Sequence, residues 1–74
     1  MIVVKEILDA GGKRKVEIFR RPDGSFGFSA WVFSEDPLEL NWFPSGRYSE
    51  CYAPDAGTAE SEARGRVEWL ARPE

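Results

Sequence analysis

The sequence predicts an α+β domain: an antiparallel β-meander of four to five strands with one C-terminal α-helix packed across one face. Residues 16–33 have the pattern of a β-hairpin, and residues 58–72 repeat apolar side chains at helical spacing. A chain of 74 residues has the size of one small domain, so we expect a single domain over residues 1–74.

The central hairpin is defined by its turn, Pro22-Asp23-Gly24, which separates two runs rich in β-branched and aromatic residues. Proline presets φ at the first corner of a type I turn, and glycine takes the left-handed position that closes it with a bulge. This loop sets a register that places Ile18 opposite Phe28 and Val16 opposite Ala30. The hairpin therefore has one apolar face, which predicts where the core lies.

A first strand is predicted over residues 2–8, which are rich in β-branched residues and precede a turn at Gly11-Gly12. We expect it to pair antiparallel with the strand around Val16. Its register stays open. Two sets of side chains compete for the core-facing side: Val3 with Ile7, or Ile2 with Val4 and Leu8.

The segment 34–52 has two interpretations. Side chains alternate with period two over 38–42 and again over 48–52, with a Pro-x-Gly turn between them. This pattern predicts a second short hairpin from 38–43 and 47–52. In the alternative, residues 38–43 form a covering loop and only 47–52 pairs with the sheet.

The C-terminal segment predicts the helix. Thr58 is the expected N-cap, with Glu60 and Glu62 in a first turn whose dipole favours acidic groups. The buried stripe follows spacings of four, four and three: Ala59, Ala63, Val67 and Leu70. Three Glu-to-Arg pairs at i, i+4 support the exposed side: Glu60–Arg64, Glu62–Arg66 and Glu68–Arg72. Arg72 and Pro73 mark the expected end.

The predicted main core unites the apolar sides of hairpin and helix. Its members are Val16, Ile18, Phe26, Phe28, Ala30, Ala59, Ala63, Val67 and Leu70.

Composition argues against several classes of function. Thirteen acidic and ten basic residues give a net charge of −3, unlike the basic domains that bind duplex nucleic acid. The chain has no histidine, which removes the usual nucleophilic pairs and the commonest metal ligand. Cys51 is the single cysteine and fits a buried structural thiol. We therefore expect no catalytic site, no metal and no cofactor.

The expected location is the cytoplasm. The apolar start is too short for a signal peptide and is interrupted at Lys5. No run approaches the roughly 20 apolar residues that span a bilayer. A lone cysteine fits a reducing compartment.

The other face of the central hairpin is the candidate binding surface, because it combines aromatic rings with cations. Its residues are Phe19, Trp31, Phe33, Lys13, Lys15 and Arg21. The register places Lys15 opposite Trp31 and Lys13 opposite Phe33, which predicts cation–π contacts.

Three interpretations of this surface are open. Aromatic residues and arginine are enriched in protein interfaces, which favours a partner surface. Residues 34–52 could instead cross this face and bury it with Leu38, Leu40 and Trp42 as a second core. The third interpretation is single-stranded nucleic-acid binding, in which bases stack on rings and cations attract phosphates. It would use Trp31, Phe33, Lys13 and Lys15.

The favoured function is a small non-catalytic protein-interaction module of accessory or inhibitor type. A chain this short gains stability from association, so we expect it to self-associate as a homodimer or to bind another protein. A single-stranded nucleic-acid-binding domain is the alternative, and no membrane contact is expected.

Overall fold

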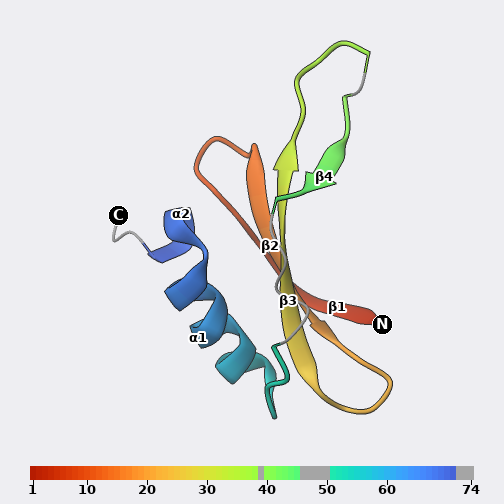
Figure 1. Cartoon of the computed structure of the whole chain (residues 1–74), viewed down its shortest axis with the longest axis vertical. Coiled ribbons are helices and arrows are strands. Elements are labelled where there is room, and N and C mark those ends of the chain that lie inside the picture. Colours follow the sequence, from red (N-terminus) through yellow and green to blue (C-terminus); the bar gives the residue numbers. More distant parts are fainter. Residues whose placement is uncertain (39, 46–50, 72–74) are drawn as a thin grey trace.

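A computed structural model describes residues 1–38, 40–45 and 51–71 of the chain. The described residues form four strands and two helices: β1 (Ile2–Leu8), β2 (Arg14–Arg20), β3 (Phe26–Phe33), β4 (Trp42–Pro44), α1 (Ala56–Arg66) and α2 (Glu68–Ala71). The strands pair antiparallel in the order β1-β2-β3-β4, and both helices lie on one side of the sheet (Figure 1). The predicted α+β meander with a C-terminal helix is confirmed.

The central hairpin has the predicted turn and register. Gly24 has φ +88°, and its N–H donates to the Arg21 carbonyl at 3.0 Å. The Arg21 N–H donates to the Ser25 carbonyl at 2.8 Å, which closes the three-residue loop. The predicted pairs are Ile18 with Phe28 and Val16 with Ala30, and both are present.

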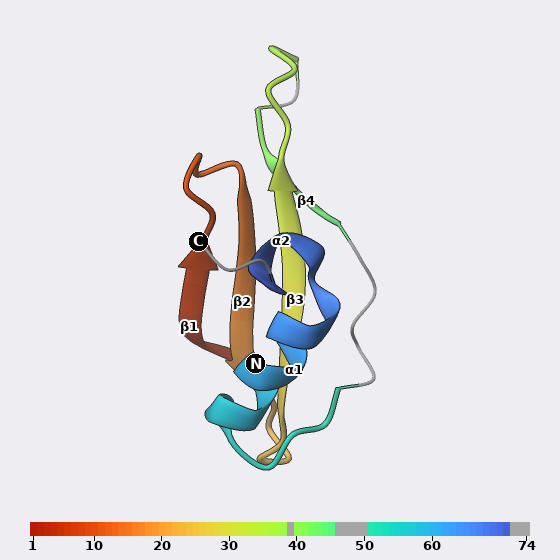
Figure 2. The ribbon, with the colours of Figure 1, turned by 90° about the vertical axis from the view of Figure 1, so that its left-hand side faces the viewer.

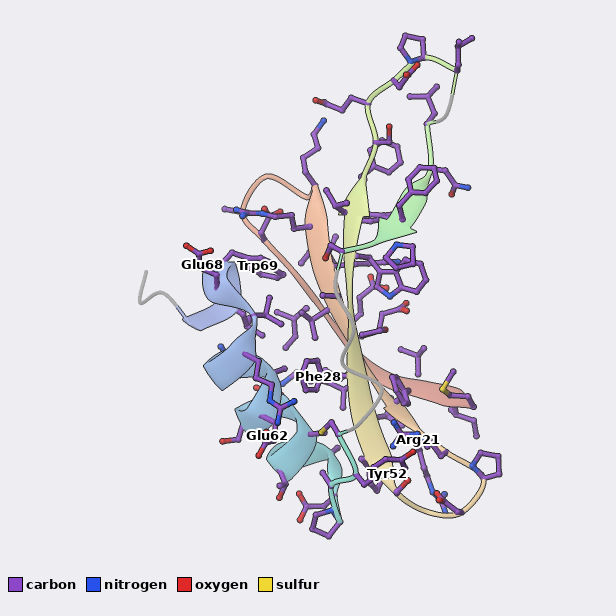
Figure 3. The ribbon with its side chains drawn as sticks, viewed as in Figure 1. Arg21, Phe28, Tyr52, Glu62, Glu68 and Trp69 are labelled. Carbon is purple, nitrogen blue, oxygen red and sulfur yellow. The ribbon has the colours of Figure 1, made fainter. Side chains whose placement is uncertain are left out.

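The core lies between the helices and the side of the sheet that we call the helix face. Its buried residues are Val16, Ile18, Phe28, Ala30, Cys51, Ala53, Ala59, Ala63, Val67 and Leu70. Ala59 and Ala63 are fully buried, and their small side chains let α1 lie close to β2 and β3. Figure 3 shows Phe28 between the sheet and α1. Phe26 is only half-buried, at the margin of the predicted core.

The helix begins earlier than predicted, so the expected N-cap at Thr58 is wrong. Asp55 is the N-cap, with extended backbone at φ −152° and ψ 169°. Its carboxylate accepts the Thr58 N–H at 2.7 Å. Because Asp55 captures this amide, Ala56 and Gly57 occupy the first turn, and Glu60 and Glu62 lie beyond it.

The helix is also interrupted at Val67. This residue takes an extended conformation, φ −88° and ψ 111°, between α1 and α2. A β-branched residue tolerates this conformation well, and the break still leaves Val67 and Leu70 buried. The ion pairs Glu60–Arg64 at 3.0 Å and Glu62–Arg66 at 3.4 Å are present. The third pair and the predicted end fall on 72–73, outside the described residues.

Strand β1 joins the sheet through a β-bulge, which resolves its open register. Ile7 pairs with Val16 and packs against the core, whereas Val3 pairs with Phe19 on the opposite face. The register shifts between Val3 and Lys5, so neither predicted set of side chains faces the core along the whole strand.

The predicted strand over 38–43 is shortened to β4, Trp42–Pro44. Strand β4 pairs with β3 through Trp31–Pro44, Val32–Phe43 and Phe33–Trp42. Leu38 and Leu40 are 94% and 61% exposed, so they do not cover the sheet as the alternative interpretation required. They lie in the long connection that carries the chain from β3 to β4, visible at the top of Figure 1.

The chain is described again from Cys51 onward and returns to the edge of β3. Ala53 forms an isolated bridge with Phe26, with two backbone hydrogen bonds of 2.8 Å. Of the predicted pairing over 47–52, residues 47–50 lie outside the described residues, and Cys51 and Tyr52 are not in a strand.

Candidate interaction surface

The outer face is the side of the sheet that points away from the helices. The strand registers place on it Val3, Glu6, Leu8, Lys15, Glu17, Phe19, Gly27, Ser29, Trp31, Phe33, Trp42 and Pro44. Figure 2, which views the other side, shows α1 and α2 in front of β2 and β3. Among the described residues, no helix covers the outer face.

An aromatic cluster occupies the β3–β4 end of the outer face. The rings of Phe33 and Trp42 meet edge to face, with centroids 5.3 Å apart at 65°. The indole N–H of Trp31 donates to Ser29 Oγ at 2.9 Å, so its polar group is satisfied within the chain. Trp31, Phe33 and Trp42 are all half-buried. We call these three residues the aromatic cluster.

Lys15 lies beside the aromatic cluster, but over a different ring from the one predicted. It is opposite Trp31 in the register, yet its ammonium is 4.5 Å from the centroid of the Trp42 ring. Carboxylate oxygens of Glu6 and Glu17 each lie 3.5 Å from Lys15 Nζ. The Lys15 side chain is only 15% exposed, so its charge is largely compensated within the sheet.

Lys13 is also engaged within the chain. The Phe33 N–H donates to the Lys13 carbonyl at 2.8 Å, as the predicted register requires. The Lys13 ammonium forms an ion pair with Glu35 instead of the expected contact with the Phe33 ring. A carboxylate attracts an ammonium more strongly than the partial charge of an aromatic face does.

Phe19 and Arg21 form a separate stack near the hairpin turn. The Arg21 guanidinium carbon lies 5.0 Å from the Phe19 centroid and 4.3 Å from the Tyr52 centroid. Arg21 Nη1 also donates to the Cys51 carbonyl at 2.8 Å. Arg21 and Tyr52 are labelled close together in Figure 3. Phe19 is a predicted member of the binding surface. Its ring is only 8% exposed, so it is not open to a partner.

Gly27 makes this stack possible. It pairs with Phe19 across the hairpin. A Cβ at this position would lie 2.7 Å from Arg21 Nη2 and 3.0 Å from both Phe19 Cε1 and the Cys51 carbonyl oxygen. A glycine opposite an aromatic ring lets the ring cover the backbone. The sequence carries a weak signal for this arrangement, a glycine within an otherwise apolar strand.

Cys51 has the character of a packed thiol. It is 6% exposed, and burial, assisted by the charge of Glu62, raises its pKa. The reactive thiolate is therefore disfavoured at neutral pH. In the described part of the chain, no group of three or more His, Cys, Asp or Glu side chains is placed to hold a metal ion.

The predicted site residues therefore separate into two groups, and Lys13, which is paired with Glu35, joins neither. Trp31, Phe33 and Lys15 come together with Trp42, which the sequence placed on a different hairpin. Phe19 and Arg21 lie in the stack near the turn.

Comparison with protein-family models, with curated proteins and with solved structures gives no match for this chain. Within the described residues, no helix has the length and apolar character needed to cross a membrane.

Proposed function

We propose that the protein is a small non-catalytic protein-interaction module that self-associates and binds a protein partner through its outer face. The observation that carries this proposal is the aromatic cluster: Trp31, Phe33 and Trp42 remain partly exposed on a sheet face that no described helix covers. Aromatic side chains of this kind dominate the binding energy of protein interfaces. An accessory or inhibitor-type role fits such a surface.

The charges around the cluster favour a protein partner over single-stranded nucleic acid. Phosphate binding needs available cations beside the rings. Lys15 is paired with Glu6 and Glu17, and Lys13 is paired with Glu35. A nucleic-acid backbone would have to displace these carboxylates and approach a chain of net charge −3. A protein surface that buries the rings needs neither change.

The environment of Cys51 supports a non-catalytic role. Its thiol is buried and its raised pKa disfavours the nucleophilic form. A free buried thiol also suits the reducing cytoplasm, where we place the protein.

Affinity capture from a cell lysate tests the outer face. The immobilised proteins are wild type, Trp31→Ala and Phe43→Ala. Phe43 is the matched control, because it is an exposed aromatic residue on the helix face of β4. We expect a protein that wild type and Phe43→Ala retain and Trp31→Ala loses. Identical capture by all three proteins would contradict the proposal.

Binding of a labelled oligothymidine at low salt tests the alternative. We expect no change in fluorescence anisotropy for the wild-type protein. Salt-sensitive binding that disappears in Trp31→Ala would replace the protein-interaction proposal with single-stranded nucleic-acid binding.

A further inference from the structure

Strand β1 is an exposed apolar edge of the sheet. Six of its seven residues are exposed, and only Ile7 is half-buried. Much of the large apolar surface left open to water in the described chain belongs to this strand and the residue before it: Met1, Ile2, Val3, Val4 and Leu8. A long apolar edge strand is a template for pairing with another strand.

The helices leave β1 largely uncovered. Figure 2 shows α1 and α2 in front of β2 and β3, with β1 at the side of the sheet. An ion pair of 2.5 Å between Lys5 and Glu60 links β1 to α1.

The backbone of β1 is oriented to accept a further strand. The Asp9 N–H donates to the Arg14 carbonyl of β2 at 2.9 Å. Antiparallel ladders alternate, so Lys5 and Ile7 direct their backbone groups toward β2 as Asp9 does. Glu6 and Leu8 therefore direct their N–H and C=O groups away from the sheet.

We infer that two copies of the chain pair antiparallel through β1, about a two-fold axis at Ile7, to form one continuous sheet. Glu6 then exchanges backbone hydrogen bonds with Leu8 of the partner subunit, and Leu8 does so with Glu6 of the partner subunit. This inference rests on the self-association in the proposed function and assigns it to the β1 edge.

The charge pattern of β1 selects this register. A two-fold axis perpendicular to the sheet places the central residue opposite its own copy. An axis at Lys5 opposes two ammonium groups, and an axis at Glu6 opposes two carboxylates. An axis at Leu8 moves the pairing into the following turn. An axis at Ile7 opposes two apolar side chains and places Lys5 opposite Asp9 of the partner subunit.

The bulge and the charge on β1 limit the pairing without preventing it. Bulges and inward-pointing lysines normally protect an edge strand. The bulge lies between Val3 and Lys5, so it ends the new ladder at Lys5. Beyond it the pairing with β2 is regular through Leu8 and continues in the Asp9–Arg14 backbone hydrogen bond. In the Ile7 register, Lys5 lies opposite Asp9 of the partner subunit, so its charge does not oppose the pairing. The other edge of the sheet contains β4, only three residues long, which favours a closed dimer over a fibre.

Pairing at β1 also changes the outer face. A two-fold axis perpendicular to the sheet keeps both outer faces on the same side. The dimer would therefore present two aromatic clusters on one continuous sheet to a partner.

Disulfide cross-linking tests the register. In a Cys51→Ser background, four variants each carry one cysteine: Lys5→Cys, Glu6→Cys, Ile7→Cys and Leu8→Cys. We expect Ile7→Cys to form the covalent dimer about tenfold faster than the other three variants, since its Cα atoms would be about 4.5 Å apart in a non-hydrogen-bonded pair. Fastest cross-linking at another position, or none at any, would overturn the inference.

Light scattering on two charge variants tests the same register without a cross-link. Leu8→Glu puts a carboxylate opposite Glu6 of the partner subunit, whereas Leu8→Lys puts an ammonium there. Both variants lose the same exposed leucine. We expect Leu8→Glu to weaken dimerisation about tenfold relative to Leu8→Lys, because two symmetric pairs change.

Lys15 makes this pair of variants decisive. Within one copy, Leu8 lies opposite Lys15, so the folded monomer favours Leu8→Glu over Leu8→Lys. Weaker dimerisation of Leu8→Glu therefore cannot come from a damaged fold. Equal dimerisation of the two variants would overturn the inference.

The Trp31→Ala variant separates this inference from the proposed function. We expect it to remain dimeric. If Trp31→Ala loses the dimer and Leu8→Glu keeps it, the dimer contact lies on the outer face. That result would overturn the β1 pairing but not the proposed function. A wild-type monomer at every concentration would overturn the pairing, and the capture experiment would still decide the outer-face proposal.

Discussion

The two faces of the sheet use neighbouring residues of the same strands in different ways. On the helix face, Val16, Ile18 and Phe28 are almost completely buried beneath α1. On the outer face, Trp31 and Phe33 stay half-exposed. None of the described buried residues is polar or charged, whereas Lys15 sits among two carboxylates and an indole ring on the outer face.

This difference separates stability from interaction. The buried core on the helix face stabilises the domain because its side chains leave water and none of the described buried residues is polar. At its β3–β4 end, the outer face keeps the rings of Trp31, Phe33 and Trp42 partly in water and compensates its charges locally. Substitutions one strand position apart should therefore affect different properties of the protein.

Removal of the Phe28 ring should destabilise the protein more than any other change considered. Phe28→Ala should lower the free energy of unfolding by about 3–5 kcal/mol, because it leaves a cavity between β3 and α1. Trp31→Ala should cost less than about 2 kcal/mol, since a half-exposed ring loses fewer contacts. Urea denaturation measures both values. Phe28→Leu, which keeps most of the volume, extends the series if Phe28→Ala does not fold.

An equal or larger loss for Trp31→Ala would contradict the comparison of the two faces. It would place the main core on the outer face.

The next effect concerns the stack near the turn. Gly27→Ala should lower the free energy of unfolding by about 1–3 kcal/mol, because the new Cβ collides with Arg21, Phe19 and the Cys51 carbonyl. Urea denaturation gives the magnitude. Near-UV circular dichroism should show the displaced aromatic rings. An unchanged spectrum and stability would show that the stack is not close-packed.

Gly65→Ala is the matched control for Gly27→Ala, and we expect it to change the free energy of unfolding in the opposite direction. Gly65 lies within α1, and a Cβ there would meet nothing within 4 Å. Gly65→Ala should raise the free energy of unfolding by up to about 1 kcal/mol, because alanine favours a helix more than glycine does. Thermal unfolding should show a higher Tm. A lower Tm would mean that this side of α1 is covered.

The smallest change in stability should come from protonation of Asp55 in acid. This residue is the N-cap of α1 and lies on neither face of the sheet. Hydrogen bonds from Thr58 hold the pKa of Asp55 below its ordinary value of 3.8. A carboxyl whose pKa is lower in the folded state stabilises the fold above the unfolded pKa and loses this contribution as pH falls through the folded pKa. Stability should therefore decline below about pH 4.

The Asp55→Asn variant isolates this contribution. The amide still caps the helix but does not titrate, so the decline of Tm between pH 5 and strongly acidic solution should be shallower than in wild type. An identical pH profile would show that the acid sensitivity resides elsewhere, for example at Asp9, whose pKa is lowered by its bond to Arg14.

Local sequence patterns specify the central hairpin, its register and most of the core. Pro22-Asp23-Gly24 specifies a turn of defined length, and the alternation of side chains then sets which residues face one another. The apolar spacing of the last segment likewise determined which side of the helix is buried. These features depend on local backbone geometry, which a short stretch of sequence encodes.

The start of the helix was harder to predict, because two nearby residues can each act as the N-cap. Asp55 and Thr58 are both good N-cap residues, and only the path of the chain from Ala53 on the sheet edge selects Asp55. The sequence of β1 offers two apolar sets of side chains for the core-facing side. The bulge changes the register between them, so neither set faces the core along the whole strand.

The partners of the charged and aromatic side chains depend instead on contacts between segments that are distant in the sequence. Arg21 meets Tyr52 and the Cys51 carbonyl some thirty residues away, and Lys15 meets Trp42 instead of its cross-strand neighbour. A long side chain can contact any suitable group within its reach. Which groups lie within reach depends on how distant strands are brought together in the fold. Periodicity thus predicts the faces of this sheet, whereas contacts across the fold decide which parts of the outer face are buried and which stay open.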